Sequence, residues 1–251
     1  MKNIQEVGLH LLQQLESEVH VWLVTPEAIT DPERLAYYTA MLSPEERERH
    51  QRFHFAKDRH SFLVSHALVR ETLSKYIDIS PADWCFSHSE HGRPEVANAD
   101  IPPLRFNLTH TDGLVCCIVT LDDDCGVDTE KITARHAMPG VAKRMFSEAE
   151  HRELRRLEGR EHLEYFFTRW TLREAYVKAR GIGISFPTRK LTFTLEKNNA
   201  VEVSFHPDIE DRRDNWHFEL LKLTGEHIAA IAIRRRSGEI DKKIVTRFIE
   251  F

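Results

Sequence analysis

The sequence has little that would favour an exported, membrane-spanning or disulfide-stabilised protein. Its 251 residues include only four cysteines, at positions 85, 116, 117 and 125, and three of these lie in or beside apolar, strand-like sequence. Such positions are typical of buried thiols in a reducing compartment. The longest apolar runs, residues 114–119 and 228–233, are far shorter than the roughly 18 residues that a membrane helix needs. The amphipathic residues 1–14 are not followed by a small-residue cleavage site, so we expect a cytoplasmic protein.

The sequence also lacks a large excess of either charge. It has 35 Lys and Arg against 40 Asp and Glu, which gives a formal net charge of −5. Binding to nucleic acid depends on neutralising many phosphates, so this balance excludes a strongly basic nucleic-acid binder. We expect that the protein binds neither nucleic acid nor a membrane. We also expect it to be monomeric.

Several common site motifs are missing. The sequence contains no Gly-x-x-x-x-Gly-Lys-Ser/Thr phosphate loop, His-Glu-x-x-His zinc helix, Gly-x-Ser-x-Gly elbow or paired Cys-x-x-Cys ligands. Two histidine pairs, His88 with His91 and His50 with His54, could bind a metal, but neither has a second ligand pair at a convincing spacing. These absences disfavour structural zinc.

The sequence does contain a series of elements that occurs twice. Ser43-Pro44-Glu45-Glu46 and Ser147-Glu148-Ala149-Glu150 each predict a helix start with a capping box. A shift of 104 residues, which aligns these two, also places Phe62 on Phe166 and His66 on Trp170. The predicted strands cover residues 19–24, 84–87, 105–109, 114–121, 126–132, 190–195, 216–223 and 227–235, with long helices over 58–76 and 162–180. The pattern predicts an α+β fold with two similar halves, residues 1–125 and 126–251.

Two carboxylates lie two residues apart in the predicted strand that opens the second half. Asp128 and Glu130, in Gly-Val-Asp-Thr-Glu, leave the same face of an extended strand. Mg²⁺ is commonly held by one or two carboxylates together with substrate phosphates, so it would balance these charges. A solvated polar strand face is the structural alternative.

Three side chains share one face of the second long helix. Trp170, Glu174 and Lys178 are spaced by four residues. An exposed ion pair between Glu174 and Lys178 is the structural alternative. The pattern also suits a metal-binding carboxylate beside a phosphate-binding ammonium group.

Basic and polar residues suggest an anion site in the first half. Thr109 and His110 end the strand Asn107-Leu108-Thr109-His110, and Arg93 lies in a Gly-Arg-Pro turn. Arg49 belongs to a helix whose basic residues are nearly balanced by acidic ones. A solvated helix, a capped turn or a core histidine would explain the same residues.

Taken together, these segments resemble the 4'-phosphopantetheinyl transferase superfamily, and specifically its large, two-half Sfp-type members. Residues 126–130 resemble the family's Gly-Ile-Asp-x-Glu strand, and residues 166–183 its Trp-x-x-Lys-Glu-x-x-x-Lys-x-x-Gly helix. Upstream, residues 93–94 resemble the Gly-Lys-Pro turn, and residues 106–110 the Phe-Asn-hydrophobic-Ser-His strand. The resemblance spans roughly residues 43–185.

The resemblance implies a pseudo-twofold fold of two similar α/β halves, with coenzyme A bound in the cleft between them. It implies that Asp128, Glu130 and Glu174 hold Mg²⁺ and that Lys178 touches the same phosphates. The first half would contribute to coenzyme A binding through residues that contact the adenosine and its 3'-phosphate: Arg49, Arg93, Thr109 and His110.

The implied reaction transfers the 4'-phosphopantetheine arm to a serine hydroxyl of an apo carrier protein and releases adenosine 3',5'-bisphosphate. The carrier would be of the acyl, peptidyl or aryl type, in fatty-acid, polyketide or nonribosomal-peptide biosynthesis. We take Glu174 as the general base and Lys178 as the group that stabilises the departing phosphate.

The sequence departs from the family pattern at three positions. Arg173 and Arg93 replace lysines and Thr109 replaces a serine. Charge or hydroxyl is kept in each case, but the planar guanidinium changes how a phosphate would be bound.

Two other functions use the same residues. One is a Mg²⁺-dependent hydrolase of a nucleotide or nucleic-acid phosphodiester, which the net charge of −5 disfavours. The other is an inactive protein that binds coenzyme A or carriers, which would predict loss of a metal carboxylate.

Overall fold

The structure is a computed structural model that describes residues 4–134, 139–183, 185–196, 200–235 and 241–249. The chain divides into two compact units. The first unit is Met1–Asp122 with Lys242–Phe251, and the second unit is Asp123–Asp241. Within the described ranges, none of the helices has the length and apolar character needed to cross a bilayer.

The first unit combines a four-stranded sheet of order β11-β1-β5-β4, a two-stranded hairpin and four helices. Its helices are α1 (Ile4–Gln14), α2 (Pro32–Met41), α3 (Pro44–Arg52) and α4 (Ala56–Leu73). Its strands are β1 (Glu18–Val24), β2 (Phe86–His88), β3 (Pro94–Val96), β4 (Leu104–Thr111), β5 (Leu114–Leu121) and β11 (Lys243–Phe248).

The second unit combines a three-stranded sheet of order β6-β10-β9, a two-stranded hairpin and three helices. Its helices are α5 (Pro139–Met145), α6 (Glu148–Leu154) and α7 (Gly159–Arg180). Its strands are β6 (Cys125–Lys131), β7 (Leu191–Leu195), β8 (Val201–Phe205), β9 (Trp216–Lys222) and β10 (His227–Arg234).

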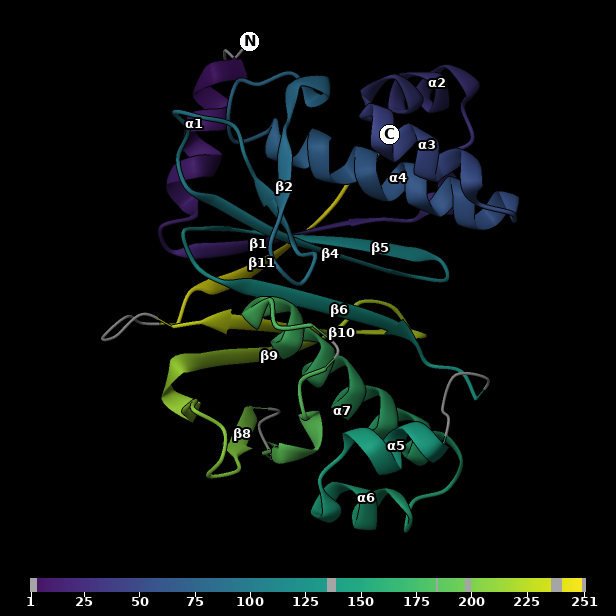
Figure 1. The fold of residues 1–251 in the computed structure, drawn as a ribbon, viewed down its shortest axis with the longest axis vertical. Coiled ribbons are helices and arrows are strands. Elements are labelled where there is room, and N and C mark those ends of the chain that lie inside the picture. Colours follow the sequence, from purple (N-terminus) through teal and green to yellow (C-terminus); the bar gives the residue numbers. More distant parts are fainter. Residues whose placement is uncertain (1–3, 135–138, 184, 197–199, 236–240, 250–251) are drawn as a thin grey trace. The chain divides into compact units, whose positions relative to one another are not determined.

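The two units repeat one order of elements, which can be followed in Figure 1. In each, a strand is followed by three helices, a short hairpin and two further strands. The antiparallel sheet β1-β5-β4 corresponds to β6-β10-β9, and the hairpin β2-β3 corresponds to β7-β8. The predicted α+β class with two similar halves is therefore confirmed.

Both predicted capping boxes are formed, and each anchors a buried arginine. The Ser43 hydroxyl accepts a hydrogen bond from the Glu46 backbone, and the Glu46 carboxylate pairs with Arg70 of α4 at 2.7 Å. In the second unit Ser147 caps α6 in the same way, and Glu150 pairs with Arg173 of α7. Both arginines are buried, at 2% and 0% exposure. The same local sequence therefore ties a short helix to the long helix in each unit.

The last strand corrects one expectation. We assigned residues 126–251 to the second half, but β11 belongs to the sheet of the first unit and pairs in parallel with β1, from Glu18 with Lys243 to Leu23 with Phe248. Parallel pairing needs a long crossover, so its partner cannot be recognised from neighbouring sequence.

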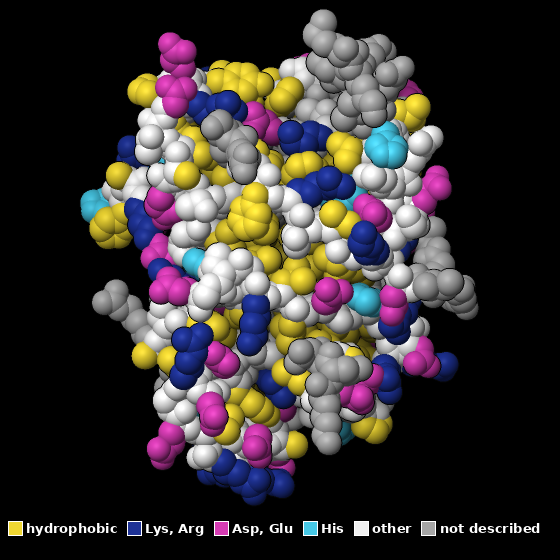
Figure 2. Space-filling view, turned by 180° about the vertical axis from the view of Figure 1, so that it is seen from behind, with side chains coloured by type: hydrophobic (Ala, Val, Ile, Leu, Met, Phe, Trp, Pro, Cys, Tyr) yellow, Lys and Arg dark blue, Asp and Glu magenta, His cyan; other side chains and the backbone are white. Residues whose placement is uncertain are grey.

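Each unit has its own apolar core beneath its long helix. In the first unit α4 packs on β4 and β5, and in the second α7 packs on β6 and β10. Cys116, Cys117 and Cys125 are buried, whereas Cys85 is exposed. On the face shown in Figure 2, basic and acidic side chains are interspersed, as the small net charge leads one to expect.

Candidate active site

The site of interest in the second unit begins with a close approach between β6 and α7. A Cβ atom at Gly126 would lie 2.1 Å from the Ala175 carbonyl oxygen and 2.5 Å from the Ala179 backbone nitrogen. Only glycine fits there, because those neighbours are backbone atoms. Since side chains alternate along a strand, Asp128 and Glu130 project from the same face as Gly126, which is the face toward α7.

The helix presents a matching row of side chains. Between Phe166 and Ala179 every residue of α7 is buried except Trp170, Glu174 and Lys178, which are partly exposed. These three are spaced by four residues and therefore form one stripe along the helix. The helical face predicted from the sequence is thus the one accessible stripe of this segment.

Hydrogen bonds join the strand and the stripe at both ends. The Lys178 ammonium group donates to Asp128 Oδ1 at 2.8 Å and to the Val127 carbonyl oxygen at 3.1 Å. The Trp170 indole donates to Glu130 Oε1 at 3.1 Å. The structure therefore brings Asp128, Glu130 and Lys178 to one site, and Glu174 lies between Trp170 and Lys178 on the helix.

Burial and the neighbouring charge of Asp128 raise the pKa of both glutamates of this site. Burial, followed by the charge of Asp128, raises the pKa of Glu130 to about 7, and Glu174 contributes to the rise. Burial and then the charge of Asp128 also raise the pKa of Glu174. Crowded, partly buried carboxylates of this kind are stabilised by a cation. Lys178 supplies one positive charge for three acidic side chains.

The donor chemistry fits a hard divalent cation, because Mg²⁺ prefers carboxylate oxygens. In the part of the chain that the structure describes, however, no three or more His, Cys, Asp or Glu side chains are already arranged to hold a metal ion. Asp128 is engaged with Lys178 and Glu130 with Trp170. Metal binding by these carboxylates therefore stays a prediction.

The predicted residues of the first unit are only partly brought together. A cavity of about 640 Å³ is lined by Arg49 and His110. Thr109 is buried, and it is not among the residues that line this cavity. Arg93 does not line it either, and its guanidinium group lies 2.7 Å from Glu95.

The same cavity contains a histidine that the sequence analysis did not select. His66 lines the cavity and pairs with Glu46 at 2.9 Å. The 104-residue repeat aligns His66 with Trp170, which belongs to the stripe of the second unit. That alignment was the signal that could have identified it.

Arg173, which replaces a lysine of the family pattern, is part of the core. It is completely buried, pairs with Glu150 and donates to the carbonyl oxygens of Met145 at 2.8 Å and Leu191 at 2.9 Å. Its hydrogen bonds hold α6, α7 and β7 together.

Comparisons with known proteins agree with the division of the chain into two units. Residues 124–232 match the 4'-phosphopantetheinyl transferase superfamily, and residues 30–121 match the 4'-phosphopantetheinyl transferase N-terminal family. The chain is 30% identical over 171 residues to 4'-phosphopantetheinyl transferase Sfp of Bacillus subtilis (strain 168), which covers 68% of this chain and 74% of that protein. It belongs to the 4'-phosphopantetheinyl transferase superfamily, as an Sfp-type member with two domains.

Two further relatives extend this result. 4'-Phosphopantetheinyl transferase HetI of Nostoc sp. is 32% identical over 176 residues, covering 69% of this chain and 73% of that protein. L-aminoadipate-semialdehyde dehydrogenase-phosphopantetheinyl transferase of Homo sapiens is 26% identical and covers 82% and 72%. The phosphopantetheinyl transferase described here is thus an enzyme that transfers 4'-phosphopantetheine from coenzyme A to carrier proteins.

Proposed function

We propose that Asp128, Glu130, Glu174 and Lys178 form the reacting part of the transferase site. In the proposed reaction the hydroxyl oxygen of a carrier serine attacks the phosphorus atom that bears the pantetheine arm. A new P–O bond forms, the P–O bond of the diphosphate breaks, and adenosine 3',5'-bisphosphate leaves. The serine proton passes to a base on the enzyme.

One observation carries this proposal: the accessible stripe of α7 faces the acidic side of β6. An ammonium group, Lys178, contacts Asp128 there at 2.8 Å. Glu130 and Glu174 add their charges to the same site. A diphosphate needs positive charge, and carboxylates can supply it only indirectly, by holding a cation.

The chemistry of the donor set supports a proposed set of metal ligands. Asp128, Glu130 and Glu174 would hold Mg²⁺, which when bound neutralises the negative charge of the diphosphate. Lys178 is partly exposed, with 27% of its side chain accessible, so its ammonium group can reach the departing phosphate.

Glu174 is the proposed base. Burial and the charge of Asp128 raise the pKa of Glu174 in the metal-free site. Lys178, one helical turn away on the same stripe, balances the charge of the ionised form.

The first unit is proposed to bind the adenosine end of coenzyme A. Arg49 and His110 line one cavity there, and a guanidinium and an imidazole suit the 3'-phosphate. Arg93 and Thr109 stay in this proposal as flanking residues, of which Thr109 is the neighbour of His110 on β4.

The proposal is tested by incubating the purified protein with coenzyme A, Mg²⁺ and apo carrier proteins, followed by intact-mass measurement. The expected result is a gain of one phosphopantetheinyl group per carrier. Asp128→Asn and Lys178→Met should each slow the gain by about 100-fold or more, since each removes a charge next to the diphosphate.

Glu153→Gln on the exposed side of α6 is the matched control, because Glu153 is exposed and pairs with Arg156 on the surface. Its rate should equal that of the wild type. Unchanged rates in Asp128→Asn and Lys178→Met would refute the proposed roles.

A further inference from the structure

A cavity of about 500 Å³ lies in the second unit between the first half of α7 and the β9–β10 hairpin. Its walls include the apolar side chains of Ile132, Leu220 and Ile228. Three cationic side chains also line it, Arg160 and Arg169 from α7 and Lys222 from the end of β9. The volume is in the range of sites that bind small molecules.

Arg169 is a buried cation whose charge is not neutralised by the protein. Its exposed fraction is 8%, and its Nε atom is buried without a hydrogen-bond partner. Among the residues that the structure describes, no carboxylate forms an ion pair with it. Its guanidinium carbon instead lies 4.0 Å from the centre of the Tyr165 ring. An aromatic face attracts a cation without cancelling its charge.

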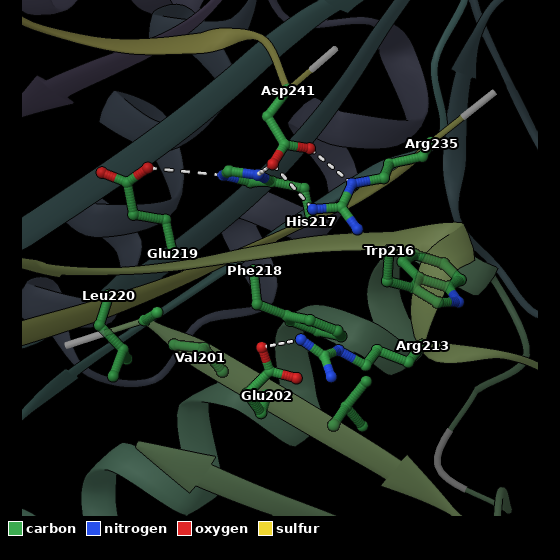
Figure 3. Close-up of a pocket in the computed structure, with 12 residues that line it drawn as sticks. Val201, Glu202, Arg213, Trp216, His217, Phe218, Glu219, Leu220, Arg235 and Asp241 are labelled. Atoms are coloured by element: carbon green, nitrogen blue, oxygen red, sulfur yellow. Dashed lines mark hydrogen bonds and ion pairs between the residues drawn. The ribbon is translucent and has the colours of Figure 1, made fainter. Parts of the chain in front are cut away.

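Other arginines of the second unit show what is missing at this position. Arg173, one helical turn further along α7, is buried against Glu150. In the cavity shown in Figure 3, Arg235 pairs with Asp241 at 2.7 Å, and Arg213 pairs with Glu202.

His217, the histidine in the cavity of Figure 3, also has carboxylate partners. His217 lies 2.9 Å from Asp241. Burial alone would lower the pKa of His217, but hydrogen bonds to Glu219 and Asp241 outweigh it and raise that pKa. The cations of the cavity in Figure 3 are thus matched by carboxylates of the protein, and Arg169 is not.

We propose that the cavity around Arg169 binds a small organic oxyanion, namely a carboxylate or a phosphate monoester with an apolar body. A guanidinium group pairs with such an anion through two parallel hydrogen bonds. Burying an unpaired charge is costly, so an anionic ligand relieves a cost that the free protein bears.

The rest of the lining agrees with one bound negative charge. Arg160 is paired with Glu164 at 2.6 Å, so these two charges cancel. Lys222 and Glu161 also line the cavity, carry opposite charges and are exposed to solvent. Among the Lys, Arg, Asp and Glu side chains of the described lining, Arg169 is therefore the one that is buried without an ion-pair partner. The apolar walls then hold the body of the ligand. This inference does not depend on the transferase reaction.

Isothermal titration calorimetry tests the proposal with hexanoate, hexyl phosphate and hexan-1-ol, in a buffer free of carboxylate, phosphate and sulfonate. We expect at least one of the two anions to bind the wild-type protein and hexan-1-ol not to bind. Acetate and inorganic phosphate should bind at least 10-fold more weakly than the corresponding hexyl anion, because they do not fill the apolar part. Which hexyl anion binds more tightly identifies the head group.

Arg169→Met keeps the apolar stem and removes the charge, and it should weaken binding of the hexyl anion at least 10-fold. Arg156→Met is the matched control, since Arg156 is exposed, pairs with Glu153 and does not line the cavity. It should bind as the wild type does. Equal affinity in wild type and Arg169→Met, or no binding of either hexyl anion to the wild type, would overturn the proposal.

A second variant decides the question if Arg169→Met does not fold. Leu157 also lines the cavity, and Leu157→Trp narrows it without changing a charge. Loss of hexyl-anion binding in a folded Leu157→Trp protein supports the proposal, and unchanged binding overturns it.

Discussion

The strands that open the two units, β1 and β6, occupy the same place in the same order of elements but differ in chemistry. The last six residues of β1 are all buried, and five of them are apolar. Its counterpart β6 has glycine and two carboxylates on the face toward α7. In the 104-residue alignment Val24 of β1 corresponds to Asp128 of β6.

The contacts that tie a short helix to the long helix are present in both units. Each has a capping-box glutamate paired with a buried arginine on the long helix. The comparison teaches that the repeat preserves the scaffold, whereas the acidic site was built in only one copy. In the first copy, the equivalent surface instead contributes His66 to a cavity lined with Arg49.

The largest expected effect comes from the glutamate–arginine ion pair that each unit contains. Glu150→Gln leaves Arg173 fully buried without its charge partner, so we expect the free energy of unfolding to fall by about 3–5 kcal/mol. Glu46→Gln in the first unit should cost less, about 1–2 kcal/mol, because 18% of the Glu46 side chain is exposed. Urea denaturation followed by circular dichroism measures both. A larger loss in Glu46→Gln would break the comparison.

The next largest effect is expected at Gly126, where β6 and α7 of the second unit approach each other closely. Gly126→Ala places a methyl group against the backbone of α7, so we expect a loss of roughly 1–3 kcal/mol and a displaced stripe. The matched control is Gly225→Ala, because nothing lies within 4 Å of its added Cβ. Thermal unfolding of the two variants checks this, and equal melting temperatures would contradict the packing described for β6 and α7.

The first unit should lose stability in acid through Glu46. Burial alone would raise its pKa, but hydrogen bonds from His66, the Ser43 backbone and Arg70 lower the pKa to about 2. The unfolded value is near 4.5, so the stabilisation is complete above that pH and is lost as the pH falls toward 2. Between pH 4.5 and 2 we expect Glu46→Gln to remove roughly 1–2 kcal/mol of pH-dependent stability, a discounted value because the carboxylate is partly exposed. An identical pH profile in the variant would show that Glu46 is not the group responsible.

The smallest expected effect tests whether the two caps are equivalent. Ser43→Ala and Ser147→Ala each remove an N-cap hydroxyl, so each should cost about 1 kcal/mol. The two losses should agree within about 0.5 kcal/mol if the local structure is truly repeated. Chemical denaturation of both variants under the same conditions gives the comparison.

Local patterns in the sequence predicted much of the fold. The capping boxes, the long helices and the strands β4, β5, β6, β9 and β10 depend on hydrogen bonds and periodicities within a few residues. Helix α2 was missed although its start carries local signals, an Asp31 N-cap followed by Pro32 and Glu33. Strand β11 was missed because its partner, β1, is about 225 residues away and imposes no local pattern.

For the candidate site, the sequence predicted which residues share a face but not which side chains contact one another. Period-two and period-four spacing identified the two facing rows, Asp128 with Glu130 and Trp170 with Glu174 and Lys178. Spacing cannot reveal which side chains bond across the rows, so the Trp170–Glu130 hydrogen bond was not foreseen. The sequence analysis also did not separate His110, which lines the cavity, from Arg93, which pairs with Glu95 two residues further along the chain.

We propose that Asp128 and Glu130 of β6 share one metal ion with Glu174, beside Lys178. Electron paramagnetic resonance of Mn²⁺, titrated into the protein with coenzyme A present, tests it most directly. We predict one bound ion in the wild type and in Glu153→Gln, and at least 10-fold weaker binding in Asp128→Asn, Glu130→Gln and Glu174→Gln. Unchanged Mn²⁺ affinity in these three variants would contradict the claim.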